Sequence, residues 1–222
     1  MYIQLLVALV NRHVHDMFSW TGKQANRSEW QFVSTTFPRN EFERHQRDTL
    51  FLAIKPDEEA ARRIYQLAEK IKHARGFEGD LIDRKRLHTT LFFLGPCEGF
   101  SEEMIARIHR AAVDLKAAPF EVTFNRTMSF LNRRDNYAFV LVGDAGVDRL
   151  RAFHRLLGAE LTRNGLRRWV HKISTPHVTL LYDKRLVDEQ PIEPISWVVR
   201  EVVLVRSLHG QHRHVARWRL CA

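Results

Sequence analysis

Two short segments of this chain carry the same pattern, a histidine and a threonine two residues apart within an otherwise apolar run. The first copy holds His88 and Thr90, and the second holds His177 and Thr179. Side chains at positions i and i+2 of an extended strand point to the same face of a sheet. Each copy is therefore predicted to present an imidazole and a hydroxyl on one face. The presence of two copies predicts that these groups converge on one substrate.

The residues before the two copies indicate an internal duplication. Apolar residues recur at helical spacing after Asp57 and again from Val147. His88 lies 31 residues after Asp57, and His177 lies 30 residues after Val147. This near-equal spacing predicts two repeats of a helix, a connection and a histidine-bearing strand.

The rest of the ordered pattern predicts strands interleaved with helices. A further helix is expected after Ser101, a suitable N-cap residue. The remaining strands are expected at Leu50–Ile54, Phe120–Phe124, Tyr137–Val142, Trp197–Val205 and His214–Leu220. The fold class is therefore predicted to be α+β, with two similar lobes of antiparallel sheet and helices around a central cleft.

The chain has 222 residues, which is enough for one large domain or two small lobes with a proper core. Residues 1–48 show no sustained period and are predicted to be an N-terminal extension, typical of a partly disordered segment. Residues 49–222 are predicted to form a single domain. Its two lobes are expected at about 49–142 and 143–222, with exchange of strands between them left open.

Composition favours a cytoplasmic protein. No apolar run approaches the roughly 18 residues that span a bilayer, and the apolar opening lacks the basic leader of a signal peptide. The only cysteines, Cys97 and Cys221, are far apart, which suits a reducing compartment and argues against a thiolate zinc site. The net charge of +9 favours phosphate-bearing partners such as nucleic acid.

A pair of imidazoles can act as general base and general acid, because imidazole titrates near neutral pH. On either side of a phosphodiester, one ring would activate water and the other would protonate the departing oxygen. The threonine hydroxyls would donate hydrogen bonds to the non-bridging oxygens as negative charge builds there. This chemistry requires no metal and no cofactor. A metal cluster of His209, His212 and His214 is the weaker interpretation of a closing hairpin rich in histidine.

Both motifs, and the order of elements around them, resemble the 2H phosphoesterase superfamily. The greatest similarity is to its bacterial LigT-like branch, the RNA 2',3'-cyclic phosphodiesterases also called 2'-5' RNA ligases. The resemblance covers the chain from Thr49 to the C-terminus. Leu87–Gly95 is similar to the family's HxTLxFLG segment, and Pro176–Leu181 matches its second HxTL segment. The resemblance also rests on the first strand, Leu50–Ile54, and on the closing strands at Val203–Ser207 and Arg217–Leu220.

The resemblance implies a bilobal fold and hydrolysis of a 2',3'-cyclic phosphate at an RNA end to a 2'-phosphate. In reverse, with a 5'-hydroxyl in place of water, the same chemistry would form a 2'-5' linkage. His88, Thr90, His177 and Thr179 fall on the family's catalytic positions. By the same resemblance, His177 would activate water and His88 would protonate the leaving 3'-oxygen. Phe93 falls on the position of an aromatic residue that can stack on the terminal base.

The chain also departs from the family pattern. Where the branch often carries a phosphate-binding arginine, five residues after the second histidine, this sequence has Tyr182. The family's tyrosine before its closing strand is replaced by His214. The candidates to bind the substrate in place of that arginine are Tyr182 itself, Lys172, Arg185 and Arg133 or Arg134.

The expected partner is RNA or a nucleotide with a 2',3'-cyclic phosphate, bound by a monomer that needs neither metal nor membrane. Two alternatives stay open at this stage. One keeps the two-histidine chemistry but uses another cyclic or 2'-5' nucleotide as substrate. The other is a non-catalytic RNA-binding module that retains the fold.

Overall fold

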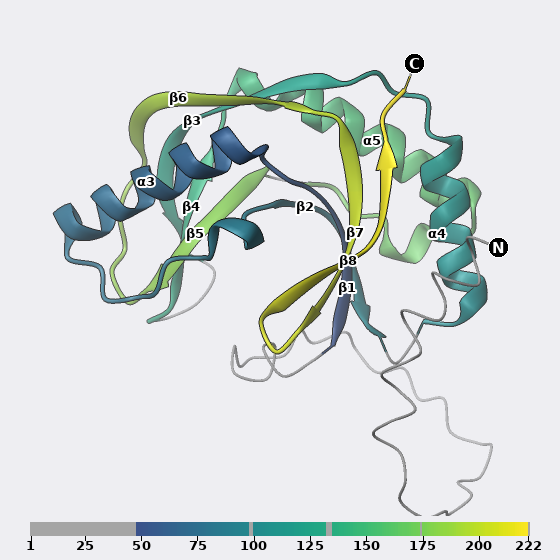
Figure 1. Cartoon of the computed structure of the whole chain (residues 1–222), viewed down its shortest axis with the longest axis horizontal. Coiled ribbons are helices and arrows are strands. Elements are labelled where there is room, and N and C mark those ends of the chain that lie inside the picture. The colour runs from purple at the N-terminus through teal and green to yellow at the C-terminus, as the bar shows by residue number, and fades with distance from the viewer. Residues whose placement is uncertain (1–47, 98–99, 132–134, 174, 222) are drawn as a thin grey trace, which may run out of the picture.

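The computed structural model describes residues 48–97, 100–131, 135–173 and 175–221. Apart from Asp48, the predicted extension at residues 1–48 lies outside these ranges. The described residues form two four-stranded antiparallel sheets with helices packed against them (Figure 1). The α+β class with two lobes, predicted from the interleaved strand and helix patterns, is confirmed.

Sheet A has the strand order β2-β1-β7-β8, and sheet B has the order β5-β4-β3-β6. The strands of sheet A are β1 (Thr49–Ile54), β2 (Thr89–Pro96), β7 (Glu201–Leu208) and β8 (Gln211–Arg219). The strands of sheet B are β3 (Phe120–Phe130), β4 (Tyr137–Val142), β5 (His177–Asp183) and β6 (Gln190–Val199). The two histidine-bearing strands, β2 and β5, therefore occupy equivalent edges of the two sheets.

The apolar run at Trp197–Val205 forms two strands, and the prediction of a single strand there is wrong. Strand β6 ends at Val199 in sheet B, and β7 begins at Glu201 in sheet A. The chain crosses between the sheets at Arg200, where no glycine or proline signals a break. Each sheet consequently takes strands from both segments 49–142 and 143–222.

The helices exchange between the lobes in the same way. Helix α3 (Glu58–Arg75) connects two strands of sheet A but packs against β5 and β6 of sheet B. Helix α5 (Asp148–Arg163) connects two strands of sheet B, yet its His154 ring stacks on Phe92 of β2 at 4.1 Å between centroids. Helix α4 (Glu102–Asp114) lies beside α5 on that side of the molecule (Figure 1). Short 3-10 turns are found at Arg84–Arg86 (η2), Ala145–Val147 (η4) and Arg167–Trp169 (η5).

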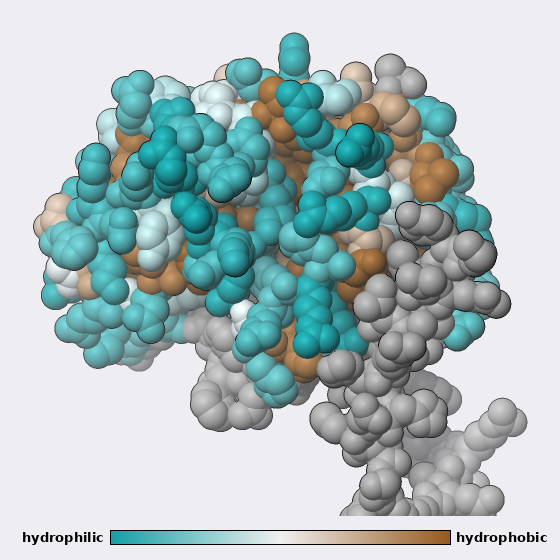
Figure 2. Space-filling view, viewed as in Figure 1, coloured by the Kyte–Doolittle hydropathy of each residue, from teal (hydrophilic) through white to brown (hydrophobic). Residues whose placement is uncertain are grey.

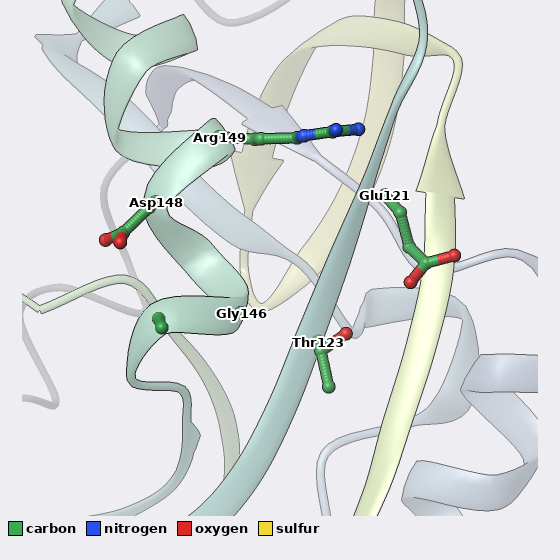
Figure 3. Close-up of a pocket in the computed structure, with 6 residues that line it drawn as sticks. Glu121, Thr123, Gly146, Asp148 and Arg149 are labelled. Atoms are coloured by element: carbon green, nitrogen blue, oxygen red, sulfur yellow. The ribbon is translucent and has the colours of Figure 1, made fainter.

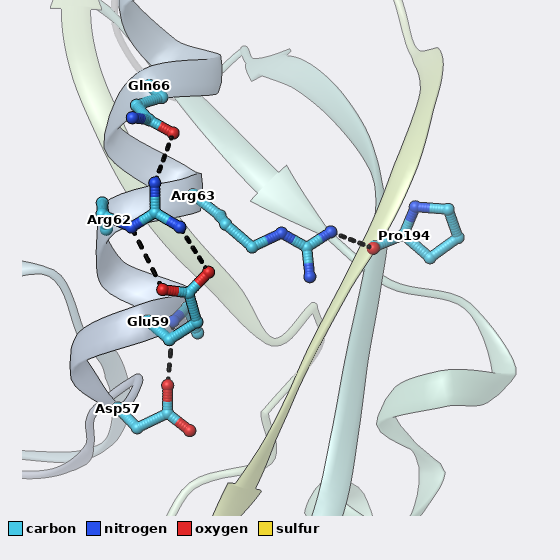
Figure 4. Close-up of polar contacts among 7 residues, drawn as sticks. Asp57, Glu59, Arg62, Arg63, Gln66 and Pro194 are labelled. Atoms are coloured by element: carbon cyan, nitrogen blue, oxygen red, sulfur yellow. Dashed lines mark hydrogen bonds and ion pairs between the residues drawn. The ribbon is translucent and has the colours of Figure 1, made fainter.

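The ends of α3 show how local sequence fixes the first repeat. The Asp57 side chain accepts a hydrogen bond from Ala60 N at 2.8 Å and caps the helix start. Gly76 ends the helix in the left-handed conformation, with φ of 64°, that favours glycine. Figure 4 shows Arg63 reaching from α3 to the carbonyl oxygen of Pro194 on β6, a distance of 3.1 Å. This contact ties the helix of the first repeat to the sheet of the second.

Each sheet has a main apolar face and a second, smaller apolar face. The main faces join the helices in one large core. On sheet A, the second face is formed by Phe51, Ala53, Val203 and Val205. On sheet B, it is formed by Ala138, Val140 and Val142. These two second faces carry the residues described in the next subsection.

Figure 2 shows hydrophilic residues over most of the visible face, with hydrophobic patches between them. No helix within the described ranges has the length and the apolar character needed to cross a membrane.

Asp183, at the end of β5, holds the connection after α3 in place. One of its carboxylate oxygens accepts hydrogen bonds from Glu78 N at 2.7 Å and Gly79 N at 2.8 Å, and the other accepts from Arg185 N at 2.9 Å. Burial alone would raise the pKa of Asp183, but these backbone donors hold it below the ordinary value of 3.8.

We expect Asp183→Asn to lower the free energy of unfolding by about 2 kcal/mol at pH 7, because the three backbone donors lose a charged acceptor. The pKa of Asp183 is lower in the folded protein, so its contribution is present above pH 3.8 and is lost as the pH falls through the folded value. The difference between variant and wild type should shrink below pH 3.8. Urea denaturation of both proteins at pH 7 and pH 3 measures this difference in the free energy of unfolding. Asp188→Asn, at an exposed position, is the matched control, and an equal effect of both variants would contradict the assignment.

Candidate active site

His88 lies directly before β2, with its ring on the second face of sheet A. The 3-10 turn η2 precedes it, and the buried Leu87 anchors the chain between the two. The Nδ1 atom of His88 donates a hydrogen bond to the carbonyl oxygen of Arg86 at 2.7 Å. The imidazole stacks on Phe51, with 4.9 Å between ring centroids and an interplanar angle of 29°. Both contacts fix the orientation of the ring.

His177, the first residue of β5, is held in a matching way on sheet B. Its Nδ1 atom donates to the carbonyl oxygen of Thr175 at 2.8 Å, again two residues earlier in the chain. Its ring meets Phe130 edge-on, with 4.8 Å between centroids and an interplanar angle of 75°. The aromatic support comes from β1 in sheet A and from β3 in sheet B.

The two backbone hydrogen bonds select one tautomer for both rings. A carbonyl oxygen can only accept, so Nδ1 carries the hydrogen in His88 and in His177. In the neutral ring, Nε2 then has the free lone pair and can take a proton. After protonation, the same Nε2 can donate it. Both histidines are thus prepared for proton transfer through Nε2.

A shift in strand register keeps Phe93 on the same face as His88. Thr90 pairs with Ala53 and Phe93 pairs with Phe51, and the register shifts between these two pairs. Paired residues on neighbouring strands share a face, so Thr90 and Phe93 lie beside the Phe51 ring that supports His88. Strict alternation would place Phe93, five residues after His88, on the opposite face. Its side chain is 42% exposed and accessible to a ligand.

Sheet B repeats this arrangement with a tyrosine. Thr179 pairs with Val140 and Tyr182 pairs with Ala138, with a register shift between them. Phe130, which contacts the His177 ring, pairs with the same Ala138 from the other side. Thr179 and Tyr182 therefore share the second face with His177. Tyr182 is the counterpart of Phe93, five residues after its histidine.

Electrostatic interactions connect the two histidines. Burial is the main cause that lowers the pKa of His88 to about 4. The hydrogen bond to the Arg86 carbonyl acts in the opposite direction, while the charges of His177, Lys55 and the Arg86 side chain lower the pKa further. Burial also lowers the pKa of His177, while its hydrogen bond to Thr175 acts in the other direction. The influence of His177 on His88 shows that the two rings, one from each sheet, lie within the range of an electrostatic interaction. Both rings are neutral in the free protein at pH 7.

The model of the 2'-5' RNA ligase superfamily matches residues 56–211, a range that includes both histidines and both threonines. The chain belongs to the 2'-5' RNA ligase superfamily.

Solved structures that include E. coli LigT have the same fold. The apo form of E. coli LigT is 25% identical with a TM-score of 0.62, over 80% of this chain and 99% of that one. The protein TT0787 of Thermus thermophilus is 26% identical with a TM-score of 0.56, over 78% and 97%. A crystal structure described as a phosphoesterase, 24% identical with a TM-score of 0.59, supports the fold alone. A search of curated proteins gives no match.

These comparisons confirm the LigT-like 2H phosphoesterase family and its bilobal α+β fold, both predicted from the repeated motif. Membership in the 2'-5' RNA ligase superfamily indicates a phosphodiesterase that acts on RNA or nucleotides. The site described above lies within the matched range.

Three residues near His88 were not predicted from the sequence as catalytic or substrate-binding residues. Lys55 and Arg86 are close enough for their charges to lower the pKa of His88. The His212 ring lies edge-on to His88, with 5.1 Å between centroids. Arg86 stands two residues before His88, directly before the first motif. Lys55 follows β1 and His212 lies on β8, and only the sheet pairing brings them close to His88.

The structure describes two of the basic residues proposed to replace the missing arginine, Arg185 and Lys172. The Nη1 atom of Arg185 donates to the carbonyl oxygen of Arg75, at the C-terminal end of α3, at 2.6 Å. Arg185 follows the end of β5, whereas His177 is the first residue of that strand. Lys172 is exposed in the connection before β5. Arg133 and Arg134 lie outside the described residues.

In the described part of this chain, no group of three histidine, cysteine, aspartate or glutamate side chains could hold a metal ion. The alternative cluster of His209, His212 and His214 therefore has no support. His214 lies between the side chains of Lys55 and Arg217, at 3.2 Å and 2.5 Å, and these cations would repel a metal ion.

A cavity of about 500 Å³ lies apart from both histidines, between β3 and the start of α5. Figure 3 shows Arg149 extending from α5 toward β3, where Glu121 and Thr123 line the opposite wall. A second cavity of about 270 Å³ is lined by residues of α3, β3 and β6. Neither includes a histidine or another pair suited to proton transfer.

Proposed function

We propose that this protein is a metal-independent phosphodiesterase that hydrolyses 2',3'-cyclic phosphate ends of RNA to 2'-phosphates. The observation that carries the proposal is the matched pair of imidazoles on equivalent sheet edges. Each has Nδ1 fixed to a backbone carbonyl, so each leaves Nε2 for proton transfer. Membership in the 2'-5' RNA ligase superfamily supports the same reaction class.

The proposed reaction is an in-line displacement at phosphorus. With the polarity implied by the family, Nε2 of His177 takes a proton from water as the water oxygen attacks phosphorus. The bond between phosphorus and the 3'-oxygen breaks, and protonated His88 gives its proton to that oxygen. Thr90 and Thr179, both half-buried beside the rings, donate hydrogen bonds to the non-bridging oxygens, where charge accumulates. The product is a 2'-phosphate with a free 3'-hydroxyl.

The two pseudo-equivalent aromatic residues would bind the nucleoside part of the substrate. Phe93 and Tyr182 lie on the same faces as the histidines, and aromatic rings stack on bases with little sequence preference. Structures of E. coli LigT complexed with ATP and with NADP+ show that a relative with 25% and 26% identity to this chain accommodates nucleotides. One chain supplies both histidines, so a monomer suffices for the reaction. With a 5'-hydroxyl in place of water, the reverse reaction would join two RNA ends by a 2'-5' linkage.

Product analysis with an oligonucleotide that ends in a 2',3'-cyclic phosphate tests this proposal. The expected product is the 2'-phosphate, formed at the same rate with and without EDTA. Turnover of only another substrate, such as ADP-ribose 1'',2''-cyclic phosphate or a 2'-5' linked dinucleotide, would assign the site to a different phosphoester. Binding of RNA without any phosphomonoester product would favour the non-catalytic module.

The pH dependence is expected to reflect the lowered pKa values of both histidines. The active form has one neutral and one protonated ring, so kcat/KM passes through a maximum between the two apparent pKa values. Because burial lowers both pKa values below 6.5, this maximum should lie below pH 6.5. The bound phosphodiester is negative and favours protonation, so the maximum of kcat should lie at higher pH. A kcat/KM that keeps rising above pH 8 would contradict the two-imidazole mechanism.

A further inference from the structure

Three side chains on sheet A form a chain of contacts, here called the cationic cluster: Lys55, His214 and Arg217. Lys55 follows β1, and its Nζ atom lies 3.2 Å from Nε2 of His214 on β8. The other ring nitrogen of His214, Nδ1, lies 2.5 Å from an Arg217 guanidinium nitrogen. None of these three residues was identified as a phosphate ligand from the sequence.

The cationic cluster has more donors than acceptors. A neutral imidazole accepts a hydrogen bond at only one of its two nitrogens, whereas ammonium and guanidinium groups only donate. His214 therefore cannot accept from Lys55 and Arg217 together while both are charged. Arg217 stays charged, and the Lys55 ammonium already donates to the carbonyl oxygen of Lys85 at 2.5 Å, so the Lys55–His214 contact brings a cation against a ring whose acceptor nitrogen is used by Arg217. A bound anion would supply the missing acceptors and let every member of the cluster keep its hydrogens.

The surroundings of the cluster also favour an anion. Among the described residues, the Nε atom of Arg86 is buried without a hydrogen-bond partner. The nearby acids, Glu201 and Asp83, already have partners: Glu201 accepts from Arg217 at 2.8 Å, and Asp83 accepts from Lys85 N at 2.7 Å. The positive charges of the cluster are thus only partly neutralised by the protein itself.

The register of β8 places the cluster on the same face as His88. His214 pairs with Val205 and Arg217 pairs with Val203, and both valines belong to the second face of sheet A. His212, which contacts the His88 ring, stands two residues before His214 on that strand. Strands β1 and β4 occupy equivalent places in the two sheets, and Lys55 after β1 corresponds to Gly143 after β4. The cluster therefore lies on the face of sheet A that carries His88.

We propose that Lys55, His214 and Arg217 bind a second phosphate of the substrate, the one on the 5'-oxygen of the terminal nucleotide. This inference rests on the proposed function and specifies its substrate class. The 5'-phosphate is a monoester in a mononucleotide and the internucleotide diester in RNA. The site therefore selects nucleotides that carry this phosphate in addition to the cyclic one.

The titration behaviour of the histidines is consistent with this assignment. Burial is the largest cause that lowers the pKa of His214 to about 4, and the charges of Lys55 and Arg217 contribute to the decrease. Burial likewise lowers the pKa of His212 to about 3, with further decreases caused by His88, Arg86, Lys55 and His214. A phosphate in this position would oppose the effect of the cations and raise both values.

The kinetic test compares adenosine 2',3'-cyclic phosphate with the same nucleotide carrying a 5'-phosphate. The wild-type protein is expected to prefer the second substrate in kcat/KM. In Lys55→Met and in Arg217→Gln, this preference should fall about tenfold, as for the loss of one charge-assisted hydrogen bond. Any effect of Lys55 on His88 acts on both substrates and cancels in the ratio. Lys70→Met, on the exposed side of α3, is the control and should keep the wild-type ratio.

A binding measurement keeps the inference separate from the proposed reaction. Isothermal titration compares adenosine 2',5'-bisphosphate with adenosine 2'-phosphate, and NMR follows the ring signals of His214. The bisphosphate is expected to bind more tightly, to lose about tenfold in affinity in Lys55→Met, and to shift the His214 signals. If no cyclic phosphodiester is turned over, the proposed function fails while this comparison still tests the cluster. Equal binding of the two ligands, or equal effects of Lys55→Met and Lys70→Met, would overturn the inference.

Discussion

Replacement of His88 or His177 with alanine is expected to lower kcat for a 2',3'-cyclic phosphate substrate by roughly 10²–10⁴-fold in each case. Each variant lacks one of the two proton transfers, while Thr90, Thr179 and the stacking residues still bind the substrate. KM should therefore change much less than kcat. The double variant should lose less than the product of the two single effects, because the two rings act as a unit.

His171→Ala provides the matched control for these two variants. The Nδ1 atom of His171 donates to the carbonyl oxygen of Trp169 at 2.9 Å, two residues earlier, as in His88 and His177. Its ring, however, lies edge-on to Phe92 of the core. Activity of this variant should stay within about twofold of wild type. Circular dichroism and thermal unfolding of all three variants separate lost chemistry from lost structure. A His88 or His177 variant that is folded and nearly fully active would exclude the two-histidine mechanism.

The repeated motif predicted the positions of the two histidines because the face on which a strand residue lies depends only on local geometry. A histidine and a threonine two residues apart share a face in any strand, and the spacing from helix to histidine recurs in both repeats. These features predicted the equivalent positions of His88 and His177, and the two sheets have them at equivalent edges. The start of α3 after Asp57 likewise follows from a local cap.

Features that depend on pairing between distant strands could not be predicted in this way. The register shifts that return Phe93 and Tyr182 to the histidine faces arise from the partners β1 and β4. The segment Trp197–Val205 is apolar on both sides of the charged pair Arg200 and Glu201, and the change of sheet between β6 and β7 occurs at this pair. Lys55 reaches His214 across 159 positions of sequence. Its role depends on where β1 and β8 lie in sheet A.

The environments of the two histidines are asymmetric, and this bears on their roles. Lys55, Arg86 and His212 lie around His88, whereas the ring of His177 lies against the apolar Phe130. In the free protein the charges of Lys55 and Arg86 disfavour a proton on His88, the ring that the family resemblance assigns as acid. We expect bound phosphates to reverse this effect, because their negative charge offsets the cations. Protonation of His88 would then depend on the substrate being in place.

A substrate with sulfur in place of the 3'-oxygen should identify the acid. When the phosphorus–sulfur bond breaks, the thiolate leaves without protonation, because a thiol has a pKa of about 8.5 and an alcohol is far less acidic. With His88 as acid, His88→Ala should act on this substrate within about tenfold of wild type, while His177→Ala keeps its full 10²–10⁴-fold loss. Single-turnover rates with both substrates measure the effect. Recovery by His177→Ala instead would reverse the two roles, and recovery by neither would mean that leaving-group protonation does not limit the reaction.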